Sequence, residues 1–361
     1  MSAATARADA PVLVMAGGTG GHIFPGLAVA EELKSRHVPV VWLGAAGGLE
    51  TRLVPQHGLQ LETLPISGMR GKGLLTLLAT PLRVMRAVAA ARGLLRTLAP
   101  RCVLSLGGYV AAPGGIAAQL AGVPLVVHEQ NSIAGLTNRL LARHARRVLT
   151  GFDGVFANGE WVGNPVRAAI AAVPAPKRRY AGRAGALHLL VLGGSQGAQS
   201  LNAALPEVLR RRGARLDVVV RHQCGAKHLD KARAAYMNAG IEADVVPFED
   251  DMAAAYAWCD LVICRSGALT LAELEAAGVP SILVPYPHAV DDHQTRNAEA
   301  MVAAGAARLV AEGDDFVKRL GAMFEEIGRR EVLVRMAEAA RSLAHPDAAR
   351  RIADACLEVA A

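Results

Sequence analysis

Short apolar runs that stop at glycines alternate along this chain with segments of helical periodicity. Two of these runs open similar motifs, VLVMAGGTGGH at residues 12–22 and LLVLGGSQGA at residues 189–198. Further pairs of runs follow in the same order, CVLSLGG at 102–108 with LVICRSG at 261–267, and AGVPLVV at 121–127 with AGVPSILV at 277–284. An order of motifs that occurs twice indicates an internal duplication.

Strands that alternate with helices predict parallel sheets joined by crossover helices. Each half of the chain is therefore expected to form a doubly wound, Rossmann-like α/β domain, and the two domains are expected to face a central cleft. The length of 361 residues agrees with two domains. We expect the first at residues 1–164, joined by a C-terminal helix at 346–361, and the second at 165–345. Residues 173–185, rich in proline and arginine, predict a linker or surface loop.

The run at residues 102–127 carries no charge and is long enough to suggest a membrane span. Glycines and prolines interrupt it, which favours a strand, a helix and a second strand instead. The five cysteines are scattered without a CxxC pair, so neither a disulfide framework nor a zinc ribbon is predicted. The apolar run at 12–16 is too short for the core of a signal peptide, and a reducing cytoplasm is expected.

Positive charge is concentrated in one part of the chain. The 39 Lys and Arg outnumber the 32 Asp and Glu by seven, and seven basic residues lie between Glu62 and Glu129, where no acidic residue occurs. Segment 66–96 in this interval is basic and apolar, which favours an anionic membrane surface. A buried amphipathic helix whose arginines face water would give the same pattern. Nucleic acid is not expected as a partner, because aromatics make up 4% of the chain and no DNA-binding motif occurs.

The two glycine loops, at residues 17–22 and 193–198, predict sites for phosphate groups. Glycines let backbone N–H groups approach an anion at a helix N-terminus, and Ser195 adds a hydroxyl donor. Neither a strict GxGxxG nor an acidic residue at the end of strand 40–46 is present, which disfavours a nicotinamide-dependent oxidoreductase. No GxxxxGK[ST] sequence occurs, so a P-loop nucleotidase is not supported. Tight turns without a ligand remain the alternative.

His22 and Glu129 are the candidates for acid–base chemistry. His22 follows the first glycine loop at a helix start, where the positive dipole end favours neutral imidazole, the form that accepts a proton. A structural role is its alternative. Glu129 and Asn131 follow the apolar strand 124–127, where a carboxylate and an amide can position sugar hydroxyls. The alternative for Glu129 is that it caps the following helix.

Two polar side chains in the second half add to the candidate site. Glu273 lies one turn into the helix after strand 261–264 and can accept both hydroxyls of a ribose, although a surface glutamate in a first turn is the alternative. Gln294, in the connection 287–298, can bind a sugar. The acidic cluster at 249–251 is interpreted as the start of a helix at 251–258 rather than as a metal site. No metal or cofactor is predicted.

Nine motifs occur in register from about Val12 onward: GGTGGHIFPGLA, ISGMRGKG, GGYVAAPGG, HEQNSIAGLTNR, GNPVR, GGSQGA, EDDMAAAYAWCD, CRSGALTLAELEAAGVP and DDHQTRNA. Together they closely resemble the MurG family of UDP-N-acetylglucosamine:N-acetylmuramyl-(pentapeptide)-pyrophosphoryl-undecaprenol N-acetylglucosaminyltransferases. The resemblance implies a GT-B fold and an inverting, metal-independent transfer of GlcNAc from UDP-GlcNAc to the 4-hydroxyl of MurNAc in lipid I. The products are lipid II and UDP, in peptidoglycan biosynthesis. It also implies peripheral attachment to the cytoplasmic face of the plasma membrane through segment 66–96.

The resemblance also carries roles for individual residues. In this family the second domain binds UDP-GlcNAc, and the first binds the acceptor and the membrane. The resemblance implies that Ser195 contacts the diphosphate of the donor and that Gln294 and Asn131 contact its GlcNAc. The nucleotide is contacted by Arg167 and by the stretch Ala268, Leu269, Thr270, Leu271, Ala272 and Glu273, in which Glu273 binds the ribose. The first glycine loop adds donor contacts from Thr19, Gly20 and Gly21. Glu249 stands where the family usually has an isoleucine beside uracil.

The base for the acceptor hydroxyl stays open between His22, the first choice, and Glu129, the second. Three other functions also fit parts of the pattern. They are a UDP-N-acetylglucosamine 2-epimerase, a non-enzymatic binder of polyprenyl diphosphate, and a glycolipid synthase with a diacylglycerol acceptor. The basic and apolar segment argues against the epimerase, and the intact donor motifs argue against a pure binder.

Overall fold

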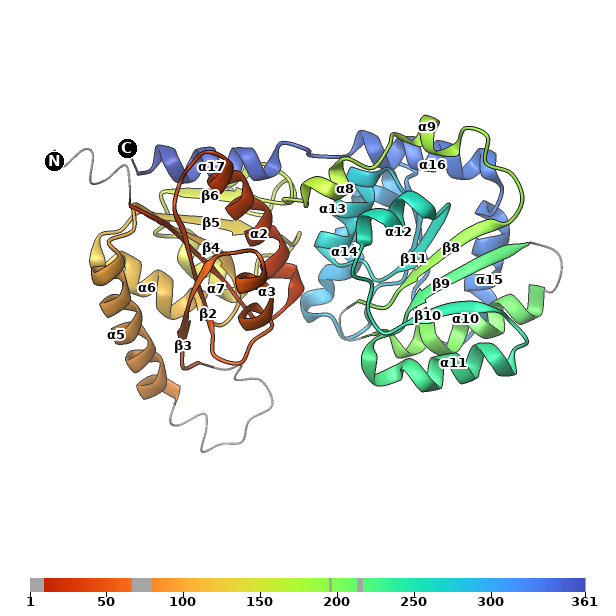
Figure 1. Cartoon of the computed structure of the whole chain (residues 1–361), viewed down its shortest axis with the longest axis horizontal. Coiled ribbons are helices and arrows are strands. Elements are labelled where there is room, and N and C mark those ends of the chain that lie inside the picture. The colour runs from red at the N-terminus through yellow and green to blue at the C-terminus, as the bar shows by residue number, and fades with distance from the viewer. Residues whose placement is uncertain (1–9, 67–79, 195–196, 213–216, 361) are drawn as a thin grey trace. The chain divides into compact units, whose positions relative to one another are not determined.

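The computed structural model describes residues 10–66, 80–194, 197–212 and 217–360 (Figure 1). The chain forms two compact units, unit 1 with Met1–Arg167 and Pro346–Ala361, and unit 2 with Ala168–His345. The boundary between them lies after Arg167 rather than after Asn164.

Unit 1 contains, among its described residues, a seven-stranded parallel sheet with the order β3-β2-β1-β4-β5-β6-β7. Its strands are β1 (Val12–Ala16), β2 (Val40–Ala45), β3 (Gln60–Leu64), β4 (Cys102–Gly107), β5 (Leu125–Glu129), β6 (Arg147–Thr150) and β7 (Glu160–Trp161). The strand order reverses direction between β1 and β4. In open α/β sheets such a switch point is where ligands bind.

Helices cover both faces of this sheet (Figure 1). They are α2 (Gly20–Ser35), α3 (Glu50–Gln56), α5 (Thr80–Leu98), α6 (Ala111–Ala121), α7 (Leu136–Ala142) and α17 (Ala348–Glu358). Alternate side chains of β1 point to opposite faces. Val12, Val14 and Ala16 pack with α2, α3 and α17, whereas Leu13 and Met15 pack with α5, α6 and α7. A strand that is buried on both faces has apolar residues at nearly every position. The sequence pattern predicted these strands because their apolar runs are continuous.

The uncharged run at residues 102–127 forms β4, α6 and β5, so the predicted strand, helix and strand are confirmed. Across the ranges that the structure describes, no helix combines the length and the apolar character that a membrane span requires.

Helix α5 is amphipathic. It buries Ala87, Ala91 and Leu95 against the sheet side, and Leu82 and Met85 are exposed. Its four arginines, which face solvent, are Arg83, Arg86, Arg92 and Arg96. Residues 67–79 of the predicted membrane-binding segment lie outside the described residues.

Unit 2 contains, within the ranges described, a six-stranded parallel sheet with the order β10-β9-β8-β11-β12-β13. Its strands are β8 (Leu187–Leu192), β9 (Val218–Gln223), β10 (Ala243–Val246), β11 (Leu261–Cys264), β12 (Ser281–Leu283) and β13 (Ala307–Leu309). The direction of the strand order reverses between β8 and β11, which are the counterparts of β1 and β4.

The helices of unit 2 again lie on both faces of the sheet (Figure 1). They are α8 (Ala168–Ala171), α9 (Pro176–Tyr180), α10 (Gln199–Arg212), η2 (Ala226–His228), α11 (Leu229–Asn238), α12 (Met252–Trp258), α13 (Ala268–Ala277), η3 (Val290–Asp292), α14 (His293–Ala303), α15 (Phe316–Ile327) and α16 (Arg330–Ser342). Helices α10, α11 and α15 pack on one core with alternate residues of β8, namely Leu187, Leu189 and Val191.

The prediction of a linker or surface loop at residues 173–185 is wrong for its central part, which forms α9. Arg179 is 7% exposed, and its guanidinium donates to the carbonyl oxygens of Ala277, at 2.6 Å, and of Gly278. These carbonyls lie at the C-terminal end of α13, where backbone acceptors lack helical partners. The arginine that suggested a solvated loop therefore caps a helix.

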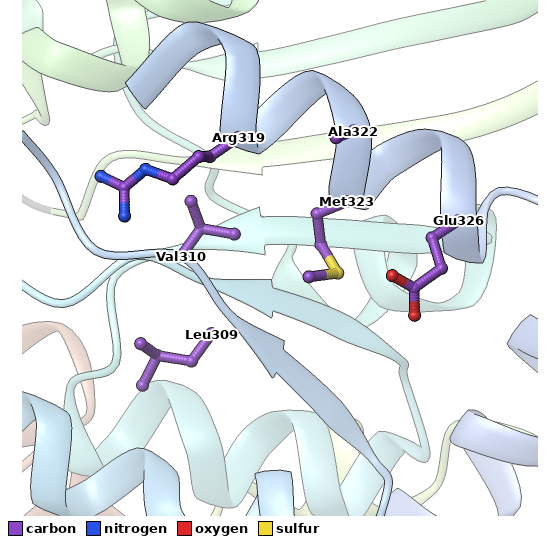
Figure 2. A pocket seen from close by; sticks show the side chains of 6 residues that line it. All are labelled: Leu309, Val310, Arg319, Ala322, Met323 and Glu326. Carbon is purple, nitrogen blue, oxygen red and sulfur yellow. The ribbon is translucent and has the colours of Figure 1, made fainter. Parts of the chain in front are cut away.

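A pocket of about 300 Å³ lies beside β13 and α15 (Figure 2). Its lining residues are Leu309, Val310, Arg319, Ala322, Met323 and Glu326. None of the residues predicted from the sequence to bind substrate lines it.

Candidate functional site

The loops that follow β1 and β4 meet at the switch point of unit 1. A Cβ atom added to Gly108 would lie 2.3 Å from the carbonyl oxygen of Gly17, and Gly108 has a φ of +87°. Only glycine therefore fits at position 108. This close approach brings the first glycine loop beside Gly107, Gly108 and Tyr109, a neighbourhood that the sequence analysis did not identify.

A buried carboxylate holds the first glycine loop. Glu50 is fully buried, and its carboxylate accepts hydrogen bonds from the backbone N–H of Ala45 at 2.8 Å and of Gly18 at 3.2 Å. A Cβ added to Gly17, Gly44 or Gly48 would lie 2.4, 2.6 or 2.3 Å from an atom of the Glu50 side chain. The Gly18 N–H therefore already has a carboxylate partner within the protein.

Replacing Gly48 with alanine is expected to lower the free energy of unfolding by about 1–3 kcal/mol, the usual cost of overpacking. Glu50 cannot retreat, because the other two glycines also enclose it. Gly93→Ala is the matched control, since nothing lies within 4 Å of an added Cβ there. It should stabilise α5 by about 0.5–1 kcal/mol. Denaturant unfolding of both variants checks this, and equal stability of Gly48→Ala and wild type would contradict the packing argument.

His22 lies in the first turn of α2, half-buried, with its imidazole against the loop after β4. Its Nδ1 is 3.0 Å from Oε1 of Gln130, and a Cβ added to Gly107 would lie 3.1 Å from its Cε1. Within the described ranges, His22 Nε2 makes no hydrogen bond. The ring is thus held from one side, and its second nitrogen is available to a ligand.

Glu129 is 2% exposed and is saturated by donors. It accepts from the backbone N–H of Asn131 at 3.0 Å and of Gly135 at 3.1 Å, and from the side-chain amides of Asn131 at 3.2 Å and Asn138 at 2.9 Å. Gly135 is the residue that precedes α7. The carboxylate therefore organises residues 130–138 and orients Asn131, through the N–H of the N-cap residue and through side chains rather than through the N–H groups of the first turn of α7.

The other predicted residues of unit 1 gather at the start of α2. Thr19 is the exposed N-cap residue, and its hydroxyl makes no capping hydrogen bond. Gly20 and Gly21 are the first two residues of the helix. The guanidinium of Arg167 lies 4.9 Å above the ring of Phe24, one turn further along. The structure thus brings Thr19, Gly20, Gly21, His22 and Arg167 together.

In unit 2 the predicted nucleotide-binding stretch forms the start of α13, after the N-cap residue Gly267. Glu273 is 8% exposed, so its alternative as a surface glutamate is wrong. The hydroxyl of Tyr256 donates to Glu273 Oε2 at 3.1 Å, and burial raises the pKa of that hydroxyl, which keeps it protonated. Of the stretch, Ala268, Leu271 and Ala272 are buried, and Leu269 and Thr270 are half-buried.

Gln294 lies in the first turn of α14 and is half-buried. Its Oε1 accepts from the backbone N–H of Tyr286 at 2.9 Å. Asp291 and Asp292, just before the helix, have φ values of 55° and 50°. Consecutive left-handed residues that are not glycine store backbone strain, which is typical of ligand-binding segments.

The acidic cluster begins a helix, as predicted. Asp251 is the N-cap of α12 and accepts from the N–H of Ala254 at 2.9 Å. Glu249 is 5% exposed, and burial raises its pKa, although Arg221 pairs with it at 2.8 Å. Its side chain is thus turned toward the protein. No group of three potential metal ligands occurs in the ranges that the structure describes.

The second switch point involves one residue that was predicted, Ser195, and one that was not, Arg265. Ser195 lies outside the described residues, so its role stays a prediction. Arg265, which the sequence analysis did not single out, follows β11 directly. It pairs with Glu312 at 2.5 Å, donates to Ser200 Oγ at 3.0 Å, and lies 5.5 Å from the ring of Tyr286. A basic residue at the end of an apolar strand is the signal that could have identified it.

Two doubly wound parallel units, each with a glycine loop after the first strand of its sheet, are the architecture of a GT-B glycosyltransferase. The family models agree. The glycosyltransferase family 28 N-terminal domain matches residues 12–150, and the C-terminal domain of the same family matches residues 188–352. The chain belongs to glycosyltransferase family 28.

Close relatives carry one function name, "UDP-N-acetylglucosamine--N-acetylmuramyl-(pentapeptide) pyrophosphoryl-undecaprenol N-acetylglucosamine transferase". The protein of Xanthomonas campestris pv. campestris (strain 8004) is 60% identical over 97% of this chain and 82% of its own length. That of Xylella fastidiosa (strain Temecula1) is 58% identical over 96% of both chains. The crystal structure of Acinetobacter baumannii MurG, 36% identical, covers 97% of this chain and 99% of its own with a TM-score of 0.82. The predicted resemblance and α/β fold class are confirmed.

Proposed function

We propose that this glycosyltransferase moves GlcNAc from UDP-GlcNAc to the 4-hydroxyl of MurNAc in lipid I, forming lipid II and UDP. The observation that carries the proposal is 60% identity, over 97% of the chain, to a relative named for this reaction. The candidate residues agree with it, since each unit presents polar side chains at its switch point. The solved structure of a UDP-GlcNAc 2-epimerase, 13% identical to this chain, has the same fold. At this identity the likeness supports the architecture and not an epimerase activity.

Unit 2 is proposed to bind the donor. Glu273 is buried, and the Tyr256 hydroxyl orients its carboxylate, a group that can accept both hydroxyls of a ribose. The first turn of α13 supplies backbone N–H groups without helical partners, which suit the nucleotide's phosphates. Ser195 near the diphosphate and Gln294 on the sugar complete the proposed contacts, and Glu249 would act through its backbone beside uracil.

Unit 1 is proposed to receive the acceptor and to supply the base. The acceptor hydroxyl attacks the anomeric carbon while His22 takes its proton and the bond from that carbon to the UDP oxygen breaks. Attack from the side opposite the leaving group inverts the configuration in a single displacement. His22 fits the role better than Glu129, because the lone pairs of Glu129 are engaged by four donors.

Release of UDP tests this function. UDP should be released from UDP-GlcNAc only when a lipid I analogue is present, and the release should persist in EDTA. Conversion of UDP-GlcNAc to its 2-epimer without acceptor would replace the proposal with an epimerase. Binding of the analogue without UDP release would indicate a polyprenyl diphosphate binder, and turnover with diacylglycerol alone would indicate a glycolipid synthase.

We also propose that unit 1 binds the anionic inner face of the plasma membrane. The support is a group of exposed apolar side chains on three neighbouring helices that share one face of the sheet (Figure 1). These side chains are Leu82 and Met85 of α5, Ile116 and Leu120 of α6, and Leu136 and Leu140 of α7. Helix α5 also carries exposed arginines, and basic with apolar side chains are the composition of a membrane-surface element.

Flotation with vesicles tests the membrane proposal. The protein should bind vesicles that contain phosphatidylglycerol, and not vesicles of phosphatidylcholine alone. Each basic side chain near such a surface contributes about 1 kcal/mol, so Arg83→Glu with Arg86→Glu should weaken binding by at least about tenfold. Lys227→Glu with Lys231→Glu, on exposed positions of unit 2, makes the same change in net charge. Equal loss in both double variants would refute a local patch.

A further inference from the structure

A chain of hydrogen bonds connects the backbone of Gly163 to the imidazole of His22. His128 Nε2 lies 3.0 Å from the carbonyl oxygen of Gly163. The side-chain nitrogen of Gln130 lies 3.0 Å from His128 Nδ1 and 2.9 Å from the His128 carbonyl oxygen. Gln130 Oε1 then lies 3.0 Å from His22 Nδ1. His128 is fully buried and Gln130 is 1% exposed, so both are shielded from water.

The direction of every bond in this chain follows from its fixed end. A carbonyl oxygen only accepts, so His128 Nε2 must carry a proton. Burial lowers the pKa of the His128 imidazole to about 4, and the ring is therefore neutral, with a lone pair on Nδ1. Two acceptors, this lone pair and the His128 carbonyl oxygen, face the same end of Gln130. That end must be the amide NH₂, which donates one hydrogen to each.

The other end of Gln130 is then the carbonyl oxygen, which only accepts. His22 Nδ1 must donate to it, so in neutral His22 the lone pair is on Nε2. The ring is also fixed in position, because its Cε1 packs against the backbone at Gly107. A single tautomer and a single orientation are thus imposed on a side chain that is itself only half-buried.

We propose that Gln130, oriented by His128, is a positioning residue that holds His22 in the Nδ1–H tautomer and so presents Nε2 as the proton acceptor for the substrate hydroxyl. The proposal rests on the proposed function, in which His22 is the base. A neutral amide has this effect without adding a charge beside the base. The sequence HEQN contains both positioning residues, but the contact with His22 joins positions 108 residues apart.

Histidine NMR on the full-length wild-type protein tests the tautomer directly. Long-range proton–nitrogen spectra of protein labelled with ¹⁵N-histidine show which ring nitrogen carries hydrogen, and the His22 signals are those missing from His22→Ala. We expect Nδ1–H for His22 and Nε2–H for His128. An Nε2–H tautomer of His22 in the wild type would overturn the inference, and this result needs no variant of Gln130 to fold.

Gln130→Met tests the consequence for catalysis. Methionine keeps the length of the side chain and removes the acceptor. A catalytic histidine locked in the wrong tautomer lowers kcat by about 10⁴-fold. Without Gln130, His22 can still adopt either tautomer, so we expect the smaller loss of about 10–100-fold in kcat. The KM for UDP-GlcNAc should stay within about twofold, and His22 should shift toward Nε2–H. Gln56→Met, at an exposed position, is the matched control.

The outcomes separate this inference from the function on which it rests. Unchanged kcat in Gln130→Met would refute the positioning role. Full activity in His22→Ala, together with an Nδ1–H tautomer in the wild type, would refute the base and leave the hydrogen-bonded chain in place. Thermal unfolding of Gln130→Met close to that of wild type would show that the loss of kcat comes from His22 and not from loss of structure.

Discussion

Replacing His22 with alanine is expected to lower kcat for acceptor-dependent UDP release by about 10²–10⁴-fold, the usual contribution of a positioned general base. The acceptor hydroxyl must lose its proton as it attacks, and His22 Nε2, at the switch point of unit 1, makes no hydrogen bond within the described residues. Binding of UDP-GlcNAc should change little, because the His22 side chain is not among the proposed donor contacts. Single-turnover kinetics and calorimetric titration measure the two quantities separately.

His57→Ala is the control for this experiment. His57 is also in unit 1 and also bonds through Nδ1, to Glu31 at 3.2 Å, but the pair is exposed at the surface. Such pairs contribute little, so this variant should keep wild-type kcat within about twofold. A His22→Ala variant as active as His57→Ala would assign proton removal to another group. A loss confined to KM would assign His22 to binding.

The strands and glycine turns of both units were predictable because their causes are local. A parallel strand covered on both faces must be apolar at nearly every position, as β1 and β4 are, and its close turn at Gly108 excludes any side chain. Periodicity and glycine spacing record both constraints. The position of His22 followed from the same pattern, because it lies just after the glycine turn at the end of β1.

Contacts between distant segments produce no local pattern in the sequence. Glu50 holds Gly18 from 32 residues away, and Gln130 meets His22 across 108 residues. Arg179 stands in a segment whose composition is that of a loop, yet its guanidinium caps a helix about 98 residues further on. A polar side chain in a sequence does not show whether water or a buried backbone group is its partner. These residues became interpretable only when the fold supplied the partner.

Replacing Glu129 with alanine is expected to lower the free energy of unfolding of unit 1 by about 3–5 kcal/mol, because buried donors lose an anionic acceptor. Asn138 is 3% exposed and cannot turn to water, and the N–H groups of Asn131 and Gly135 lose their partner as well. Activity should fall together with stability. A catalytic base would behave differently, since its removal would lower kcat in a protein that unfolds like the wild type.

A double-mutant cycle with Asn138 isolates the cause. Asn138→Ala removes one donor to Glu129, and the remaining three still engage the carboxylate. Once Glu129 is alanine, the Asn138 side chain has lost its strongest partner, so removing it should add little further destabilisation. We therefore expect a coupling free energy of about 1–3 kcal/mol between the two positions, from denaturant unfolding of the four proteins. Additive effects would show that Glu129 acts through something other than this buried network, and would return it to consideration as the base.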